Sequence, residues 1–182
     1  IRTMEEYYEK ELLVGVSGIL NGSSNYILTK ICNEGTTYAD ALLEAQNLGF
    51  AESNPHFDVA GWDTLYKLVV LTGHSFRLIT NPKTIFRLGI SSIDIADVKF
   101  AKAQGVNIRL VANSVKINDQ QLAVYVIPTF VPRTHPLYSV DNEYNAVVVE
   151  GFGYEKQVMT GKGAGASPTG SAVLSDVAAL YR

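Results

Sequence analysis

The sequence predicts an α+β fold in which a mixed β-sheet carries helices packed on one face. Helical patterns dominate the first half of the 182-residue chain, and strand-like runs dominate the second half. Hydrophobic residues make up 47% of the chain and charged residues 18%, which is a composition typical of a packed core. No repeat and no Pro/Gly/Ser-rich linker divides the sequence. We therefore expect one domain over residues 1–182.

Residues 1–105 are expected to hold one strand and four helices. The strand covers residues 12–20, which are rich in apolar and β-branched types. The helices are expected over residues 24–33, 38–48, 62–72 and 92–104. Each is followed by a glycine that favours a helix end, namely Gly35, Gly49, Gly73 and Gly105. Thr37 and Asp40 resemble a capping box, and residues 50–61 are expected to be irregular.

The second half is expected to supply most of the sheet. Strand-like runs cover Val106–Val115, Leu122–Phe130, Asn145–Glu150 and Tyr154–Thr160. A last helix is expected to begin near Pro168, after a Ser167 cap, and to run to the end of the chain.

Charge and cysteine content exclude several classes of protein. The net charge is −3, and no Lys/Arg run offers a surface for nucleic acid. The single cysteine, Cys32, rules out a disulfide within the chain and favours a reducing, cytoplasmic setting. Its place in a helical pattern indicates a small buried side chain rather than a nucleophile. No apolar run has the length of a membrane span, and no signal peptide is expected.

One lysine stands out on the helix expected over residues 62–72. From Leu65 to Leu71 every residue is apolar except Lys67, so we expect this ammonium group to be buried and paired. Asp63 lies four residues earlier on the same helix face and is the natural partner. An ordinary helix salt bridge is the common explanation for such a pair, although these apolar surroundings require no surface bridge.

More acids precede this helix. Glu52 and Asp58 lie in the expected loop, so three carboxylates and one lysine fall within 16 residues. This density indicates a functional site. His56 lies between the two acids and is expected to be solvated rather than catalytic. The spacing matches no metal-ligand pattern, so no metal is expected.

A glycine-rich stretch follows the last expected strand. Gly161, Gly163 and Gly165 allow a ligand to approach the backbone closely, and a helix start favours an anion. The spacing Gly-x-Gly-x-Gly is not the dinucleotide fingerprint. The stretch is therefore either a backbone wall beside a cofactor held elsewhere or a plain flexible turn.

Several blocks of the chain together resemble the homoserine dehydrogenase family. The blocks are Gly18-Ile19-Leu20-Asn21-Gly22-Ser23-Ser24-Asn25-Tyr26-Ile27-Leu28, Ala45-Gln46-Asn47-Leu48-Gly49-Phe50-Ala51-Glu52, Asn54-Pro55, Asp58-Val59, Gly61-Trp62-Asp63, Lys67, Val131-Pro132, His135-Pro136-Leu137, Asn145-Ala146-Val147 and Gly161-x-Gly163-Ala164-Gly165 with Pro168-Thr169. The resemblance covers essentially the whole chain. It implies the substrate-binding and dimerisation domain of a two-domain dehydrogenase, without the amino-terminal nucleotide-binding domain.

The resemblance also implies an activity and roles for particular residues. The family interconverts aspartate β-semialdehyde and homoserine with NAD or NADP, in threonine, methionine and isoleucine biosynthesis. Asp63 and Lys67 would act on the reacting oxygen. The substrate would contact Gly22, Ser23, Ser24, Glu52 and Asp58, and the nicotinamide would lie along Gly161, Gly163 and Gly165. A homodimer is expected, and the chain alone is expected to be inactive.

Two other readings remain open. The chain could be a non-catalytic amino-acid-binding or assembly module that keeps the pocket without redox chemistry. It could also belong to another two-domain reductase, such as a relative of dihydrodipicolinate reductase, although the pattern over residues 45–67 argues against this.

Overall fold

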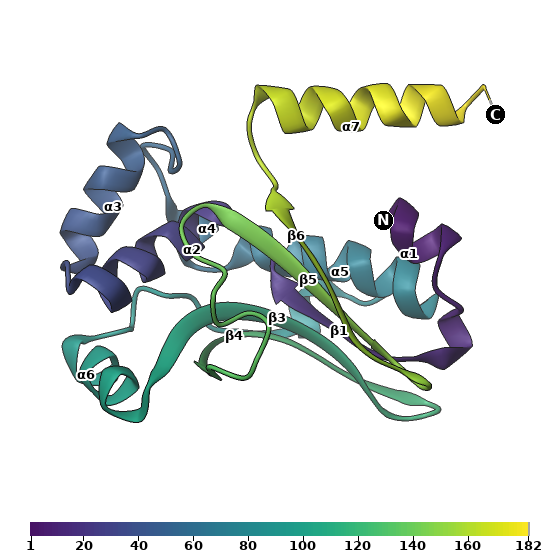
Figure 1. Ribbon diagram of the computed structural model, residues 1–182, viewed down its shortest axis with the longest axis horizontal. Helices are drawn as coiled ribbons and strands as arrows, with labels where there is room; N and C mark the ends of the chain where they lie inside the picture. The colour runs from purple at the N-terminus through teal and green to yellow at the C-terminus, as the bar shows by residue number, and fades with distance from the viewer. Residues whose placement is uncertain (182) are drawn as a thin grey trace.

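The computed structural model describes residues 1–181, apart from the side chain of Tyr154, and shows a six-stranded mixed sheet (Figure 1). The strand order is β2-β4-β3-β1-β5-β6. The strands are β1 (Leu13–Ile19), β2 (Phe86–Arg87), β3 (Val106–Asn118), β4 (Gln121–Pro132), β5 (Tyr144–Gly151) and β6 (Tyr154–Lys162). All neighbours are antiparallel except β2 and β4, which makes the sheet mixed. The strand nearest the amino terminus therefore lies inside the sheet, between two later strands.

Helices cover one face of this sheet, as predicted. They are α1 (Arg2–Glu6), α2 (Gly22–Thr29), α3 (Tyr38–Asn47), α4 (His56–Val59), α5 (Trp62–Phe76) and α6 (Ile95–Gln104). Helices α2, α5 and α6 contact the strands directly. A π-helical turn, Lys30–Glu34, extends α2, and short 3-10 turns occupy Lys10–Leu12 and Pro82–Thr84. None of the helices in the described chain is long and apolar enough to cross a membrane.

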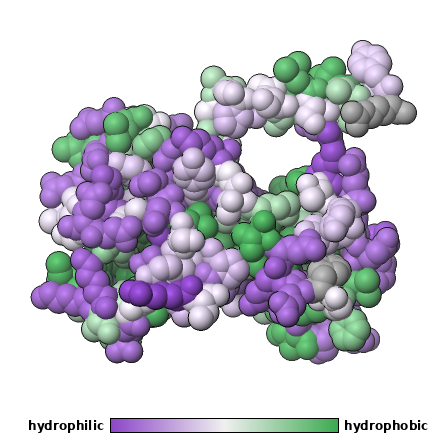
Figure 2. Space-filling view, in the orientation of Figure 1, coloured by the Kyte–Doolittle hydropathy of each residue, from purple (hydrophilic) through white to green (hydrophobic). Residues whose placement is uncertain are grey.

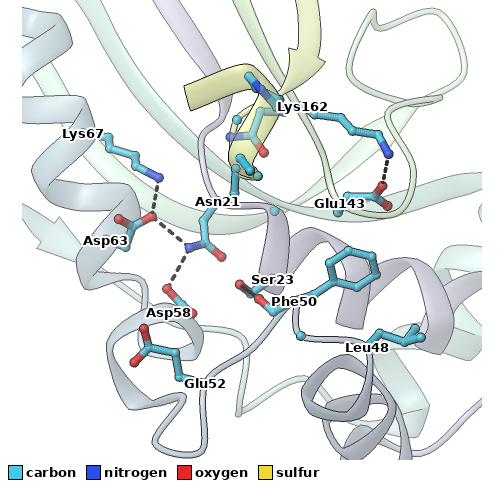
Figure 3. Close-up of a pocket in the computed structure, with 18 of the residues that line it drawn as sticks. Asn21, Ser23, Leu48, Phe50, Glu52, Asp58, Asp63, Lys67, Glu143 and Lys162 are labelled. Atoms are coloured by element: carbon cyan, nitrogen blue, oxygen red, sulfur yellow. Dashed lines mark hydrogen bonds and ion pairs between the residues drawn. The ribbon is translucent and has the colours of Figure 1, made fainter. Parts of the chain in front are cut away.

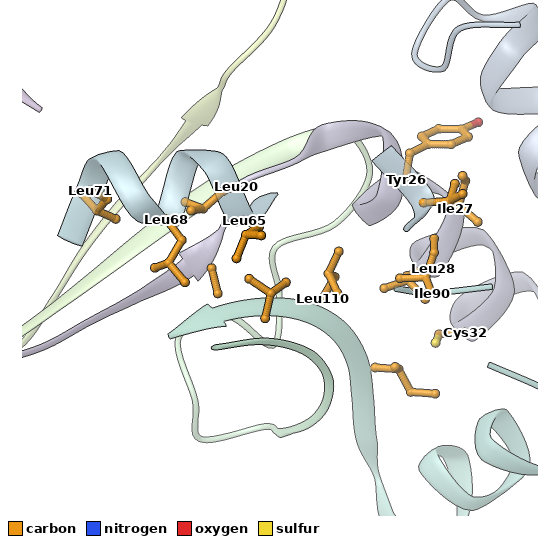
Figure 4. Packing of buried hydrophobic residues seen from close by; sticks show 14 of the residues in the cluster. Leu20, Tyr26, Ile27, Leu28, Cys32, Leu65, Leu68, Leu71, Ile90 and Leu110 are labelled. Carbon is orange, nitrogen blue, oxygen red and sulfur yellow. The ribbon is translucent and has the colours of Figure 1, made fainter. Parts of the chain in front are cut away.

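The core lies between these helices and the sheet. Side chains alternate along β3, so Ile108, Leu110 and Ala112 join the cluster that includes Leu65 and Leu68 of α5 (Figure 4). A second, smaller cluster contains strand residues from the opposite face of the sheet, among them Val111, Val131 and Val148. Leu137 and Val140 also belong to it. The sheet thus has apolar side chains on both faces. Helices cover one face, and the segment between β4 and β5 contributes to the packing of the other.

A buried arginine ties that connecting segment to helix α2. Arg109 on β3 is 0% exposed, and its Nη2 lies 2.5 Å from Asp141 Oδ1. The same guanidinium donates to Thr29 Oγ1 at 3.1 Å and to the Tyr138 carbonyl at 3.0 Å. A charge in this position needs such partners, because a buried cation without them is costly. The segment carrying Tyr138 and Asp141 is therefore fixed just before residue 143.

The last helix, α7 (Ala166–Ala179), lies apart from the rest of the domain (Figures 1 and 2). Arg2 of α1 donates to Ser175 Oγ at 2.7 Å and to Asp176 Oδ1 at 2.5 Å. Apolar side chains of α7 such as Val173 and Leu174 remain exposed. Figure 2 shows apolar residues on this helix and an open space beneath it. The helix is thus attached to the body mainly through β6.

Several predicted boundaries need correction. Helix α5 continues through Gly73 to Phe76, and the following residue, Arg77, takes the left-handed φ of 55°. Helix α7 begins at Ala166 with Gly165 in the cap position, so Ser167 is not its cap. Helix α4 lies within residues 50–61, which were expected to be irregular. Helix α1 and strand β2 were not predicted. All of these are short elements or ends that packing decides.

Candidate active site

A pocket of about 640 Å³ opens where the two halves of the chain meet (Figure 3). One wall comes from the β1–α2 turn, the loop after α3, α4 and the first turns of α5. The other wall comes from the start of β5, the end of β6 and the first residues of α7. Segments more than a hundred residues apart in the sequence therefore share one site.

Asp63 and Lys67 form the ion pair that the helix spacing predicts. Lys67 Nζ lies 2.8 Å from Asp63 Oδ2 and donates to the Leu20 carbonyl at 3.1 Å. The expectation that this lysine is buried is wrong, since its side chain is 51% exposed and that of Asp63 is 23% exposed. The outer face of α5 is apolar but open, with Tyr66 and Val70 both exposed. The ammonium group is consequently accessible from the pocket, and two of its three hydrogens have partners.

The first wall of the pocket carries Glu52, Asp58 and Asp63, and we call it the acidic wall. Asn21 joins two of these acids. It caps helix α2, because its Oδ1 accepts a hydrogen bond from Ser24 N at 2.8 Å. Its Nδ2 donates to Asp58 Oδ1 at 2.9 Å and to Asp63 Oδ2 at 2.8 Å (Figure 3). The β1–α2 turn therefore contacts both carboxylates.

The predicted substrate-binding residues are only partly gathered in the pocket. Gly22 and Ser23 line it, whereas Ser24 is buried and lies outside the lining. A Cβ at Gly22 would lie 2.7 Å from the Glu143 carbonyl oxygen, so only glycine allows the turn to approach β5 this closely. Ser23 Oγ donates to the Phe50 carbonyl, which holds the loop after α3 against α2.

Glu52 and Asp58 both line the pocket. Gln46 Nε2 donates to the Glu52 carbonyl at 2.9 Å and so fixes the backbone of that residue. Among residues 1–181, no hydrogen bond or ion pair engages the Glu52 carboxylate, which leaves it available for a ligand. Gly61 ends the loop with φ of 80° and directs the chain into α5. His56 is exposed and does not line the pocket.

The opposite wall carries a second ion pair. Lys162 Nζ lies 2.7 Å from Glu143 Oε1. This hydrogen bond holds the pKa of Glu143 below its usual value and raises the pKa of Lys162. Gly163 and Gly165 line the pocket beside the pair, whereas Gly161 is paired with Asn145 within the sheet, outside the lining. Two of the three predicted cofactor-side glycines thus face the site.

Asn21, Glu143 and Lys162 were not assigned roles from the sequence. Asn21 belongs to the turn-and-cap pattern Asn21-Gly22-Ser23, which predicts a helix start. The pattern does not predict that the Asn21 side chain donates to two acids. Nothing in the sequence connects Glu143 with Lys162, because the pairing of β5 with β6 brings them together. Over the described residues, no group of three or more His, Cys, Asp or Glu side chains is placed to hold a metal ion.

Comparison with known proteins matches this chain to one family throughout. The family model of homoserine dehydrogenase matches residues 1–178. The homoserine dehydrogenase of Bacillus subtilis is 37% identical over 182 residues, which cover 100% of this chain and 42% of that protein. The chain therefore spans about two fifths of the length of this curated relative.

Solved structures of homoserine dehydrogenases have the same fold as this chain. The homoserine dehydrogenase of Thiobacillus denitrificans matches with a TM-score of 0.91 and 33% identity, over 97% of this chain and 41% of that one. A hyperthermophilic archaeal homoserine dehydrogenase mutant, in complex with NADPH, matches with a TM-score of 0.79 and 30% identity, over 96% of this chain and 49% of that one. From the family match and these likenesses we conclude that the chain belongs to the homoserine dehydrogenase family.

Proposed function

We propose that residues 1–182 form the substrate-binding and catalytic domain of an enzyme that interconverts aspartate β-semialdehyde and homoserine with NAD or NADP. This reaction belongs to threonine, methionine and isoleucine biosynthesis. The observation that carries the proposal is the acidic wall of the pocket, where Lys67 lies among Glu52, Asp58 and Asp63. An amino-acid alcohol presents a cation and a hydroxyl group, and this wall offers a partner for each.

Substrate recognition is proposed to rest on complementary charge. The carboxylate of Glu52 is available for the ammonium group of homoserine, and Asp58 lies in the same wall. Gly22 and Ser23 begin helix α2, and the first amide groups of a helix have no partner within it. These amides are proposed to meet the substrate carboxylate, because a helix amino terminus favours an anion.

Lys67 is proposed to act on the reacting oxygen. Its ammonium group donates to Asp63 and to the Leu20 carbonyl, which leaves one hydrogen for the substrate. As the aldehyde is reduced, negative charge grows on its oxygen, and a positioned ammonium group stabilises that charge and supplies the proton. In the reverse direction the hydroxyl proton returns to the same nitrogen. Asp63 keeps Lys67 oriented throughout.

The turn between β6 and α7 is proposed to form the nicotinamide side of the pocket. A Cβ on Gly163 would collide with the Asn145 amide, so glycine allows this turn to approach the start of β5. Gly163 and Gly165 line the pocket without side chains, so a flat ring can approach the backbone there. When bound, the cofactor accepts or delivers the hydride. The archaeal relative in complex with NADPH supports this class of cofactor, and the nucleotide portion is proposed to bind a separate domain.

The test compares substrates that differ by one charged group. In the complete enzyme, formation of the reduced nicotinamide is measured with homoserine and with 4-hydroxybutyrate, which lacks only the ammonium group. We expect turnover of homoserine and a much lower kcat/KM for 4-hydroxybutyrate. Equal rates for the two would contradict the assignment of the acidic wall. Binding of homoserine without any turnover would instead indicate a non-catalytic binding module. The 182-residue chain alone is expected to show no turnover.

The domain is also proposed to form a homodimer through the sheet. Ile117 and Phe130 of the sheet are exposed, and exposed apolar strands are usually covered in solution. Light scattering should give the mass of a dimer at micromolar concentration. A clean monomer would contradict this part of the proposal.

A further inference from the structure

Asn21 lies between two carboxylates of the acidic wall, Asp58 and Asp63. It is 5% exposed and sits in the two-residue connection between β1 and α2. Its amide hydrogens reach Asp58 on α4 and Asp63 on α5, which are 37 and 42 residues away in the sequence. Its neighbour Leu20 accepts the hydrogen bond from Lys67. This short connection therefore contacts three of the groups proposed to bind or convert the substrate.

The orientation of the Asn21 amide follows from its neighbours. On one side the backbone N–H of Ser24 requires an acceptor, and on the other side two carboxylate oxygens require donors. A flipped amide would place its oxygen against both carboxylates and its NH₂ group against an N–H. Only the present orientation satisfies all three contacts.

The contacts of Asn21 reduce the repulsion between two negatively charged carboxylates. Asp58 and Asp63 approach a single nitrogen at 2.9 and 2.8 Å, so their carboxylates lie close together. Carboxylates in such proximity repel each other unless donors lie between them. Lys67 binds Asp63 at 2.8 Å, whereas Asn21 is the donor shared by both acids. Without the NH₂ group of Asn21, no shared donor would lie between the two carboxylates, and they would repel each other more strongly.

We propose that Asn21 is a positioning residue that holds the Asp58 and Asp63 carboxylates in the orientation needed for substrate binding and for the placement of Lys67. The inference rests on the proposed function, but the geometry can be tested separately. An uncharged amide suits this role, because it donates to two carboxylates without neutralising either. Asp58 and Asp63 therefore keep their charge for the substrate cation and for Lys67.

The first test is Asn21→Ser in the complete enzyme. Serine remains a good helix cap and loses both donors to the acids. We expect kcat/KM for homoserine to fall by about 10- to 100-fold, the usual effect of losing hydrogen bonds to charged groups. The melting temperature should fall only modestly, because the cap is preserved although the two acids lose their shared donor. Unchanged kcat/KM would overturn the proposal.

The second test is Asn21→Asp, which keeps the size and the cap but replaces the donor by an acid. The new carboxyl would face Asp58 from α4 and Asp63 and Lys67 from α5, with Glu52 in the same pocket wall. When ionised it repels both acids, and when protonated it can donate one hydrogen bond. We expect a larger loss of kcat/KM than in Asn21→Ser, with activity relative to the wild type recovering as the pH falls. A pH profile parallel to that of the wild type would overturn the proposal.

A matched control is Asn25→Ser on the same helix. Asn25 is also buried, but its Nδ2 donates to the Val140, Asn142 and Tyr144 carbonyls rather than to the acids. We expect this variant to lower the melting temperature without changing the shape of the pH profile. If Asn25→Ser reproduced the pH profile of Asn21→Asp, the special role of Asn21 would be refuted.

A crystal structure of Asn21→Ser separates failure of this inference from failure of the proposed function. Absence of homoserine turnover in the wild type would refute the proposed function alone. The crystal structure is independent of turnover, and we expect at least one of Asp58 and Asp63 to rotate away from its present position. Both carboxylates in unchanged positions would overturn the inference even in an active enzyme.

Discussion

Two ion pairs in this domain have comparable distances but opposite surroundings. Asp63–Lys67 joins groups on one helix, at 2.8 Å, and its lysine is half exposed in the pocket. Arg109–Asp141 joins β3 to the segment before β5, at 2.5 Å, and its arginine is completely buried. The lysine of the first pair can reach a ligand, whereas the guanidinium of the second pair cannot. Accessibility, rather than the strength of the pair, separates a chemical role from a structural one.

The hydrogen bonds around each pair support this distinction. Arg109 also bonds Thr29 and Tyr138, so the protein itself takes up both terminal nitrogens of the guanidinium group. Lys67 keeps one hydrogen without a partner among the described residues. We therefore expect substitutions in the first pair to affect catalysis and those in the second to affect folding.

The largest effect on catalysis is expected from Lys67→Met in the complete enzyme. Methionine keeps the length of the side chain but removes the charge, so kcat should fall about 10²- to 10³-fold while KM changes little. Lys67→Arg should not restore activity, because guanidinium has another shape and does not release its proton. Steady-state kinetics measures the loss of activity in both variants, and the melting temperature checks that their fold is intact.

Lys30→Met is the matched control for this variant. Lys30 pairs with Glu34 at 2.9 Å and with Glu44 at 3.0 Å, outside the pocket. Its loss should leave kcat unchanged. A near-normal kcat in Lys67→Met would reduce the Asp63–Lys67 pair to an ordinary helix salt bridge.

The next effect is expected from Asp141→Ala, and it concerns stability. The change leaves the buried Arg109 without its counter-ion, which typically costs about 3 kcal/mol in the free energy of unfolding. Denaturant unfolding measures this loss, and kcat below the transition should be largely retained. The double variant Arg109→Met with Asp141→Ala should recover part of the stability. Wild-type stability of Asp141→Ala would show that the buried pair is dispensable.

A smaller effect is expected from Glu52→Gln. Losing the carboxylate proposed to bind the substrate ammonium should raise KM for homoserine by about tenfold, with less change in kcat. Glu44→Gln provides a control, since Glu44 bonds Lys30 and Tyr26 away from the pocket. Equal KM values for Glu52→Gln and the wild type would remove Glu52 from the site.

The smallest effect is expected from Glu143→Gln on the opposite wall. The hydrogen bond from Lys162 lowers the pKa of Glu143 in the folded state, so this carboxylate stabilises the fold above its unfolded pKa. That contribution is lost as the pH falls through the lowered value. The pair is partly exposed, so the variant should lower the melting temperature by only about 2 °C at neutral pH. The difference in melting temperature between the variant and the wild type should disappear in acid. A difference that does not change with pH would contradict this prediction.

Local patterns predicted the parts of the site that lie close together in the sequence. The i,i+4 spacing identified Asp63–Lys67, and the Thr37 cap is present, since Thr37 accepts from Asp40 N. The exposure of Lys67 could not be predicted, because the apolar outer face of α5 suggested burial on every side. Whether such a face is covered depends on the tertiary arrangement.

Contacts between distant segments escaped prediction altogether. Arg109 and Asp141 are 32 residues apart, and their pairing depends on how the segment between β4 and β5 folds back over the sheet. The two hydrogen bonds of Asn21 to the acids likewise require β1 to lie inside the sheet with α4 and α5 placed beside its end. The fold class followed from residue patterns, whereas these contacts follow from topology.

The most direct test of the account is a crystal structure of the complete enzyme with homoserine and the oxidised cofactor. We expect the homoserine hydroxyl oxygen about 2.6–3.2 Å from Lys67 Nζ, a distance that permits proton transfer. We also expect the ammonium group against the acidic wall at Glu52, with the nicotinamide beside Gly163 and Gly165. Homoserine bound with its hydroxyl out of reach of Lys67, or bound outside this pocket, would contradict the account.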